Sequence, residues 1–391
     1  MEYSGTVLMP GGVRDLLPGE AHCKRELENN LLQLFRTWGY QEVVTPTFEY
    51  YEVLAPALGD LLHDQLYRFI DDRGQVMVLR PDMTTPIARL VSTRLQDQEL
   101  PMRLCYAANV FRRESHAGRQ REFYQAGVEL LGAEGPDADA EIIGLAAEAL
   151  KLAGVKDFRI TVGHVDVLQG LLKGAGFSAA EQQQAEIALS KKDLVTWEHL
   201  VASSRLSEDR KQVFASLPYL HGGFEVIAEI EGLVKDEQAQ RGIASLRQVW
   251  NILTSNGFRD QVGIDLTLLL GLGYYTGLVF ECYVDGVGYP LCGGGRYDEL
   301  LAKFGHSCPA TGFAIMMDRV LDALEKQALP FEAQTPDYFI TGDDMGEVSR
   351  KARELRESGF IVEVDISERP RQEAIAYASR KGIPHILVVE K

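Results

Sequence analysis

Apolar residues first recur at helical spacing in residues 20–39, near the start of the chain. Every third or fourth position of this segment is apolar, which is typical of a helix with one buried face, and Gly39 ends the pattern. The apolar face consists of Leu27, Leu31, Leu34, Phe35 and Trp38. The pattern predicts an amphipathic helix that packs on a core.

Strand and helix patterns alternate from residue 40 to residue 165. A strand broken by Pro46 comes first, and two further strands bracket a short helix. An arginine-rich loop and a returning strand follow, and then a helix with an acidic start leads to another strand. The expected strands are residues 40–50, 75–82, 102–114, 122–132 and 157–165, and the expected helices are residues 84–95 and 136–155.

Residues 177–257 have a different composition, rich in Ala, Gln, Glu, Lys and Leu and poor in strand signals. We interpret them as an inserted helical domain. Strand-like segments resume at residues 262–270 and 278–284, and residues 312–329 are expected to be a strand that runs into a helix.

The longest apolar run, Leu266–Phe280, contains two adjacent tyrosines between glycines. It is too short to span a bilayer and is bounded by Asp265 and Glu281. We therefore expect a sheet strand here, with its backbone and rings held close to another group.

Residues 333–337 have the composition of a linker, and the rest of the chain alternates strand, helix, strand, helix and strand. Parallel strands need helical crossovers, so the pattern predicts a small βαβαβ unit. We expect two domains, residues 1–332 and residues 333–391, with residues 177–257 inserted in the first.

Composition and charge narrow the function classes. Of 391 residues, 46% are hydrophobic and 25% charged, as in soluble globular proteins. The net charge of −17 argues against a nucleic-acid partner, although an acidic chain can still carry a basic face. Five cysteines without a CxxC pair predict reduced thiols in the cytoplasm and no metal site. The N-terminus lacks the pattern of a signal peptide, so we expect no membrane association.

The segment VFRRESHAGRQREFYQAGVE, residues 110–129, gathers arginines around one turn. The clustered residues are Arg112, Arg113, Arg119 and Arg121. Planar guanidinium groups bind phosphate or carboxylate in bidentate fashion, so the cluster indicates an oxyanion site. A solvated basic hairpin is the alternative for such a loop taken alone.

Three stretches, in order, resemble the signature motifs of class II aminoacyl-tRNA synthetases: a helix and strand that end at Pro46, the FRRE loop, and a strand–helix segment that ends at Arg319. At finer grain the chain is similar to histidyl-tRNA synthetases over nearly its whole length. The matching motifs are LLLGLGYYTGLVFE at 268–281, GGGRYD at 293–298 and FRRESHAGRQREFYQAGVE at 111–129. The resemblance implies an α+β fold with a class II synthetase-like antiparallel sheet core, helices, a helical insertion, and a small C-terminal α/β domain that looks like a shortened anticodon-binding domain.

The resemblance also implies a preserved histidine pocket. In the family, the carboxylate and threonine matched by LRPDMTT hold the amino group, two motif 2 residues flank the ligand, and phenols recognise the imidazole. The matched residues are Asp82, Thr84, Gln125, Glu129, Tyr274, Tyr275 and Tyr297. An ammonium held by Asp82 and Glu129, with phenol hydroxyls on the ring nitrogens, suits free histidine. The alternative is that these residues form a satisfied polar core.

Two departures from the family remove its activation chemistry. The synthetases place an arginine on the α-phosphate where this chain has Leu270, and loss of such a donor typically costs about two to three orders of magnitude in rate. Met316 stands where the synthetases have a glycine beside the adenosine, although a strand methionine is also common core filler. The remaining nucleotide and phosphate positions, which we regard as vestigial, are Arg112, Glu114, Arg121 and Arg319.

A synthetase-like chain that keeps the pocket but loses the chemistry resembles the family of ATP phosphoribosyltransferase regulatory subunits. The resemblance implies a non-catalytic chain without a cofactor that pairs with the short catalytic subunit of that enzyme. It would be required for activity and for feedback inhibition by histidine in the first step of histidine biosynthesis. A homodimer supported by the helix at 20–39, within a hetero-oligomer that binds no tRNA, is also implied.

Three alternatives stay open. The chain is a divergent histidyl-tRNA synthetase, a histidine or nucleotide sensor with another partner, or an amidating paralogue that uses the same fold, as asparagine synthetase does. The last would not need Tyr275 and Tyr297 in the histidine-type motifs.

Overall fold

The computed structural model describes residues 9–113, 120–270, 273–327, 334–367 and 369–390. The chain divides into two compact units, one formed by residues up to 15 with 24–330 and the other by residues 16–23 with 331–391. Each unit has a sheet and a buried apolar cluster of its own. In the described part of the chain, no helix is long and apolar enough to cross a membrane.

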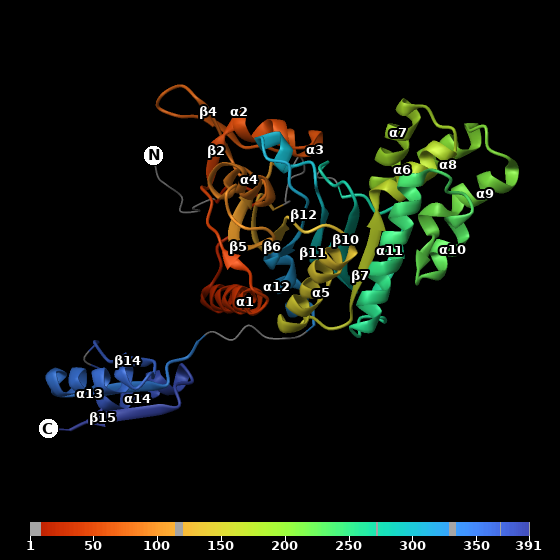
Figure 1. Ribbon diagram of the computed structural model, residues 1–391. Helices are drawn as coiled ribbons and strands as arrows, with labels where there is room; N and C mark the ends of the chain where they lie inside the picture. Colours follow the sequence, from red (N-terminus) through yellow and green to blue (C-terminus); the bar gives the residue numbers. More distant parts are fainter. Residues whose placement is uncertain (1–8, 114–119, 271–272, 328–333, 368, 391) are drawn as a thin grey trace, which may run out of the picture. The chain divides into compact units, whose positions relative to one another are not determined.

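A mixed sheet, nine-stranded in the described residues, forms the centre of the large unit (Figure 1). Neighbouring strands are antiparallel from β5 to β7 and from β9 to β8, whereas the β1–β5 and β7–β9 pairs are parallel. The strands in spatial order are β1 (Gln41–Glu42), β5 (Met102–Phe111), β6 (Glu122–Leu131), β12 (Ala310–Met316), β11 (Cys292–Arg296), β10 (Leu278–Val284), β7 (Phe158–His164), β9 (Val262–Asp265) and β8 (His221–Gly222).

Long helices cover this sheet. α5 (Pro136–Leu152) packs on β11 and β12, and α11 (Glu237–Ser255) contacts β7 and α5. In α1 (Pro18–Thr37), Leu27, Leu31 and Phe35 of the predicted apolar face are buried, whereas Leu34 is half-buried and Trp38 lies half-buried just beyond the helix. The Phe35 ring meets Phe313 of β12 edge-on at 5.9 Å between centroids. α12 (Met317–Lys326) follows β12 directly.

The segment expected to be an inserted domain is helical. α6 (Val165–Gly174) leads into α7 (Ala179–Ser190), α8 (Leu194–Ser203), α9 (Glu208–Ser216) and α10 (Glu225–Glu231). Ser178 and Glu181 form a capping box that starts α7. α11, at the end of this segment, also packs against α6 and β7, so it belongs to the cover of the main sheet.

A small antiparallel sheet lies between α1 and β5 in the sequence. Its order is β2 (Phe48–Tyr50), β4 (Val76–Leu79) and β3 (Arg68–Ile70), with the short helices α2 (Tyr51–Leu54) and α3 (Asp60–His63) between strands. α4 (Thr84–Leu90) follows β4 and continues as a π-helical turn, Val91–Leu95. The three-residue β3 was not predicted, because it is too short and too exposed to leave a pattern.

The small unit has the predicted strand–helix alternation. Its parallel sheet has the order β14 (Val362–Val364), β13 (Tyr338–Gly342) and β15 (His385–Val389), joined through α13 (Met345–Glu357) and α14 (Arg371–Arg380). The predicted α+β class is confirmed: a mostly antiparallel core sheet with helices, a helical insertion and a small C-terminal α/β unit.

The prediction of a strand over residues 266–280 is wrong for most of that run. β9 ends at Asp265, β10 begins only at Leu278, and the described residues between them lie outside any strand. Gly273 has a φ of +73°, and a Cβ there would lie 3.0 Å from the Cα of Gly59. A left-handed turn against another loop is open to glycine and ends strand geometry.

Candidate functional site

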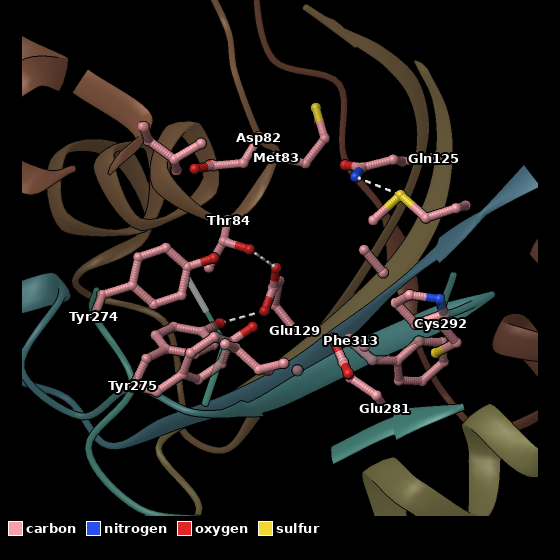
Figure 2. Close-up of a pocket in the computed structure, with 18 of the residues that line it drawn as sticks. Asp82, Met83, Thr84, Gln125, Glu129, Tyr274, Tyr275, Glu281, Cys292 and Phe313 are labelled. Atoms are coloured by element: carbon pink, nitrogen blue, oxygen red, sulfur yellow. Dashed lines mark hydrogen bonds between the residues drawn. The ribbon is translucent and has the colours of Figure 1, made fainter. Parts of the chain in front are cut away.

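A cavity of about 390 Å³ opens over the central strands of the large unit (Figure 2). Its wall comprises residues of β6, β10, β11 and β12, the loop before α4, and the segment before β10. The predicted residues that line it are Asp82, Thr84, Arg112, Gln125, Glu129, Leu270, Tyr274, Tyr275, Tyr297, Met316 and Arg319. The structure therefore brings these predicted residues together around one cavity.

Residues with little or no side chain hollow out the floor. On β12, Gly312 stands directly opposite Glu129 of β6, and a Cβ there would lie 2.0 Å from Glu129 Oε2. On β6, Gly127 stands opposite Tyr106 of β5, and its Cβ would lie 2.5 Å from the Tyr106 hydroxyl. Gly293 of β11, part of the glycine-rich GGGRYD motif, also lines the floor. The glycines therefore let a carboxylate and a phenol lie flat on the sheet.

Glu129 is the buried acid at the centre of this floor, with 1% of its surface exposed. Thr84 Oγ1 donates to its Oε1 at 2.8 Å, and the hydroxyl of Tyr297 donates to its Oε2 (Figure 2). Burial raises the pKa of Glu129 to about 8, although both hydroxyl donors oppose the shift. A cationic ligand group beside it would restore the ionised form.

Asp82 is a second buried carboxylate, just before α4. Its Oδ1 accepts the backbone N–H of Thr85 at 2.8 Å, and its Oδ2 accepts the Thr85 hydroxyl at 3.1 Å. Burial raises the pKa of Asp82, and its hydrogen bonds to Thr85 and the nearby Arg112 partly oppose the shift. Asp82 and Glu129 are thus two cavity carboxylates whose ionised forms are opposed by burial.

Three phenols stand beside these acids. The rings of Tyr274 and Tyr275 lie 4.9 Å apart, and those of Tyr274 and Tyr297 meet edge-on at 5.8 Å. Burial raises the pKa of all three hydroxyls, so they stay protonated and can donate or accept a hydrogen bond. Three adjacent phenols of this kind can contact and hydrogen-bond a flat ring with polar atoms.

The other end of the cavity carries two arginines. Arg112 Nε donates to the carbonyl of Pro81 at 2.8 Å. Arg319 Nη1 donates to the carbonyl of Pro290 at 2.8 Å, and its guanidinium lies 4.9 Å from the ring centroid of Tyr289. Burial, then repulsion from Arg112, lowers the pKa of Arg319. Both guanidinium groups thus have protein partners, and each keeps other donors.

Of the other arginines of the predicted oxyanion cluster, Arg113 does not line this cavity, and its backbone N–H donates to the carbonyl of Gln65. Arg121 does not line the cavity; its backbone N–H donates to Gly12 and its carbonyl accepts from Arg112. Glu114, like Arg119, lies outside the described residues.

Sequence reasoning missed several lining residues, chief among them Glu281, Tyr106, Tyr289 and Cys292. Glu281 is on β10 opposite Gly293, it accepts a hydrogen bond from Tyr283, and burial raises its pKa. Strand alternation through residues 278–284 could have placed it on the cavity face. Tyr106 reaches the cavity only through the pairing of β5 with β6, which no local pattern reveals. In the described ranges, no three His, Cys, Asp or Glu side chains are grouped to hold a metal ion.

Comparison with known proteins agrees with this geometry. The family model of histidyl-tRNA synthetase matches residues 12–320, and that of the anticodon binding domain matches residues 339–391. An ATP phosphoribosyltransferase regulatory subunit of Moorella thermoacetica is 46% identical over 96% of this chain and 96% of its own, and one of Desulforamulus reducens is 44% identical over 97% and 95%. A crystal structure of an ATP phosphoribosyltransferase regulatory subunit/histidyl-tRNA synthetase from Bacillus halodurans is 34% identical, with a TM-score of 0.88 over 99% of each chain. The chain belongs to the histidyl-tRNA synthetase-like family of ATP phosphoribosyltransferase regulatory subunits.

Proposed function

We propose that this chain is the non-catalytic regulatory partner of a short ATP phosphoribosyltransferase catalytic chain, and that its cavity binds free histidine as the feedback inhibitor. One observation carries the proposal. The acid-and-phenol end of the cavity is complete, whereas Leu270 and Met316 occupy the positions where histidyl-tRNA synthetases have arginine and glycine.

Charge and shape support a histidine ligand. The ammonium is expected between Asp82 and Glu129, because two desolvated carboxylates gain most from a fixed cation. The imidazole is expected against Tyr274 and Tyr275, whose hydroxyls can meet either ring nitrogen as donor or acceptor. The bound ammonium would then offset the free energy that is lost when these two carboxylates are buried away from water.

The other end of the cavity explains why the proposal excludes amino-acid activation. Leu270 places an apolar side chain in the wall where the family's phosphate-binding arginine stands. Met316 adds a long side chain on β12 where a nucleotide would approach the backbone. The developing charge of an adenylate transition state would have one fixed partner fewer.

Regulation requires an assembly, which we propose to be a homodimer of this chain within a hetero-oligomer that contains the catalytic chains. Histidine can inhibit only if it binds one state of that complex better than another. An exposed aromatic face on the small sheet supports self-association. Phe48, Tyr50 and Phe69 lie on it with 55%, 41% and 41% of their surfaces exposed.

Histidine binding tests the pocket. Isothermal titration of histidine into the full-length chain should show saturable binding, and Glu129→Gln should weaken it by about 10- to 100-fold, because a charged hydrogen bond is lost. Glu122→Gln is the matched control: it lies on the same strand, outside this cavity, and should leave the affinity unchanged. With the catalytic chain added, Glu129→Gln should assemble normally but resist inhibition. Unchanged inhibition in that variant would refute the pocket assignment.

Histidine-dependent ATP–pyrophosphate exchange tests the absence of activation, beside a histidyl-tRNA synthetase control. We expect no exchange by the wild-type chain and none by Leu270→Arg, because Met316 still occupies the nucleotide side. Exchange by the wild type would establish a working synthetase. Exchange by the single variant alone would mean that Met316 is no obstacle.

A further inference from the structure

Met316 makes a hydrogen bond that a purely space-filling side chain would not need. Its Sδ accepts the side-chain N–H of Gln125, with 3.1 Å between Nε2 and Sδ (Figure 2). The two residues stand directly opposite each other on β12 and β6, and both line the cavity. Gln125 is 2% exposed, so its amide has few partners to choose from.

The direction of this bond decides which end of the amide faces a ligand. A glutamine amide has two N–H donors and one carbonyl acceptor, whereas a thioether can only accept. With its nitrogen turned to the sulfur, Gln125 has no described residue that donates to its Oε1. The carbonyl is therefore left as an acceptor for a group in the cavity.

We propose that Met316 is a positioning residue that orients Gln125, so that the Gln125 carbonyl binds the ammonium of an amino-acid ligand. The inference rests on the histidine pocket proposed above. It assigns a role to Met316, which the sequence shows only as the replacement of the glycine found in the synthetases. Asp82 and Glu129 line the same cavity and are also acceptors, so the three groups together favour a cation. A glycine at position 316 would provide no acceptor and would leave the amide free to turn.

Substitutions at position 316 separate orientation from packing. Met316→Leu keeps a similar volume and removes the acceptor, whereas Met316→Gln places a carbonyl acceptor on a side chain of similar length. Met317→Leu is the control: it makes the same change at the next residue, which is buried on α12 and does not line the cavity. Three ligands are titrated into each full-length variant: histidine, histamine without the carboxylate, and imidazolepropionate without the ammonium.

We expect Met316→Leu to bind histidine and histamine about 3- to 10-fold more weakly, as for loss of one neutral hydrogen bond, and imidazolepropionate equally well. Met316→Gln should recover most of the loss. No change in Met316→Leu, equal weakening of all three ligands, or no recovery in Met316→Gln would overturn the positioning role while leaving the histidine pocket intact. A wild-type chain that fails to bind histidine would instead refute the proposed function, and this inference with it.

Discussion

At the acid end of the cavity, the fold buries carboxyl groups whose ionised forms would be more stable in water. Glu129 accepts hydrogen bonds from Thr84 and Tyr297, yet burial still raises its pKa to about 8. A buried ion needs a partner, and the side chains that donate to this carboxylate are two hydroxyls, which carry no positive charge. At neutral pH the free chain therefore holds Glu129 mostly protonated, and a bound ammonium is expected to reverse this.

This difference predicts proton release on binding. With a pKa of about 8, roughly nine in ten Glu129 carboxyls are protonated at pH 7 in the free chain, and the ammonium-bound form is ionised. Histidine binding should then release up to about one proton at pH 7, and affinity should rise with pH until about pH 8. Calorimetry in two buffers of different ionisation enthalpy measures the release. Equal binding heats in both buffers would contradict the prediction, and Glu129→Gln should release less than Glu122→Gln.

Residue types were more predictable than residue positions. Asp82 and Glu129 could be assigned from motif spacing, because the family's motifs fix both along the chain. The bond from Gln125 to Met316 could not be predicted, since it depends on the register of two strands that are almost 200 residues apart. Glu281 lies on the strand predicted over residues 278–284, and the alternation of side chains along that strand could have placed it on the cavity face.

At the scale of elements, β12 shapes the site as much as any side chain does. Its alternate residues Gly312, Ala314 and Met316 line the cavity and stand opposite Glu129, Gly127 and Gln125 of β6. Because Gly312 and Ala314 have little or no side chain, the cavity extends down to the backbone of the sheet. The strand therefore combines space at one end with a hydrogen-bond acceptor at the other.

Adding one carbon to this floor should damage the site. In Gly312→Ala, the new Cβ would lie 2.0 Å from Glu129 Oε2 and 2.5 Å from the Val128 carbonyl, so the carboxylate must move. We expect a loss of about 1–3 kcal/mol in the free energy of unfolding and markedly weaker histidine binding. Denaturant titration and calorimetry measure the two effects. Gly288→Ala, with no neighbouring atom within 4 Å of the new carbon, should change neither, and a wild-type-like Gly312→Ala would show that the floor is not tightly filled.

Elements with strong periodicity were predictable, and the segment that forms the cavity wall was not. α1 follows from its apolar spacing, because one of its faces must be buried, and α5 follows from its acidic start and glycine end. Residues 266–277 are as apolar as a central strand, and only tertiary contacts distinguish this loop from such a strand. Gly273 has the positive φ of a left-handed turn, and the Thr276 N–H donates to the carbonyl of Arg296 at 2.8 Å. These two features bring Tyr274 and Tyr275 beside the cavity.

At the scale of the whole molecule, charge and surface both favour protein partners. The chain carries a net charge of −17, and residues 334–391, which include the anticodon-binding-domain match, have 9 Lys and Arg against 11 Asp and Glu. Nucleic-acid affinity comes largely from neutralised phosphates, so this balance favours protein partners over tRNA. The exposed aromatic face of the small sheet points the same way, because such faces mark contact surfaces.

The aromatic face gives a direct test of self-association. Phe48 is 55% exposed, and its ring meets that of Phe69 edge-on at 6.1 Å, so Phe48→Asp should leave the fold intact while placing an unpaired charge in a proposed dimer contact. Analytical ultracentrifugation of the chain alone should show twice the 43.5 kDa chain mass for the wild type and 43.5 kDa for the variant. Val195→Asp, at an apolar residue that is 67% exposed on α8, should stay dimeric. A wild-type chain that sediments as a monomer would exclude the homodimer, and a dimeric Phe48→Asp would move the contact to another surface, with the exposed side of α1 as the next to test.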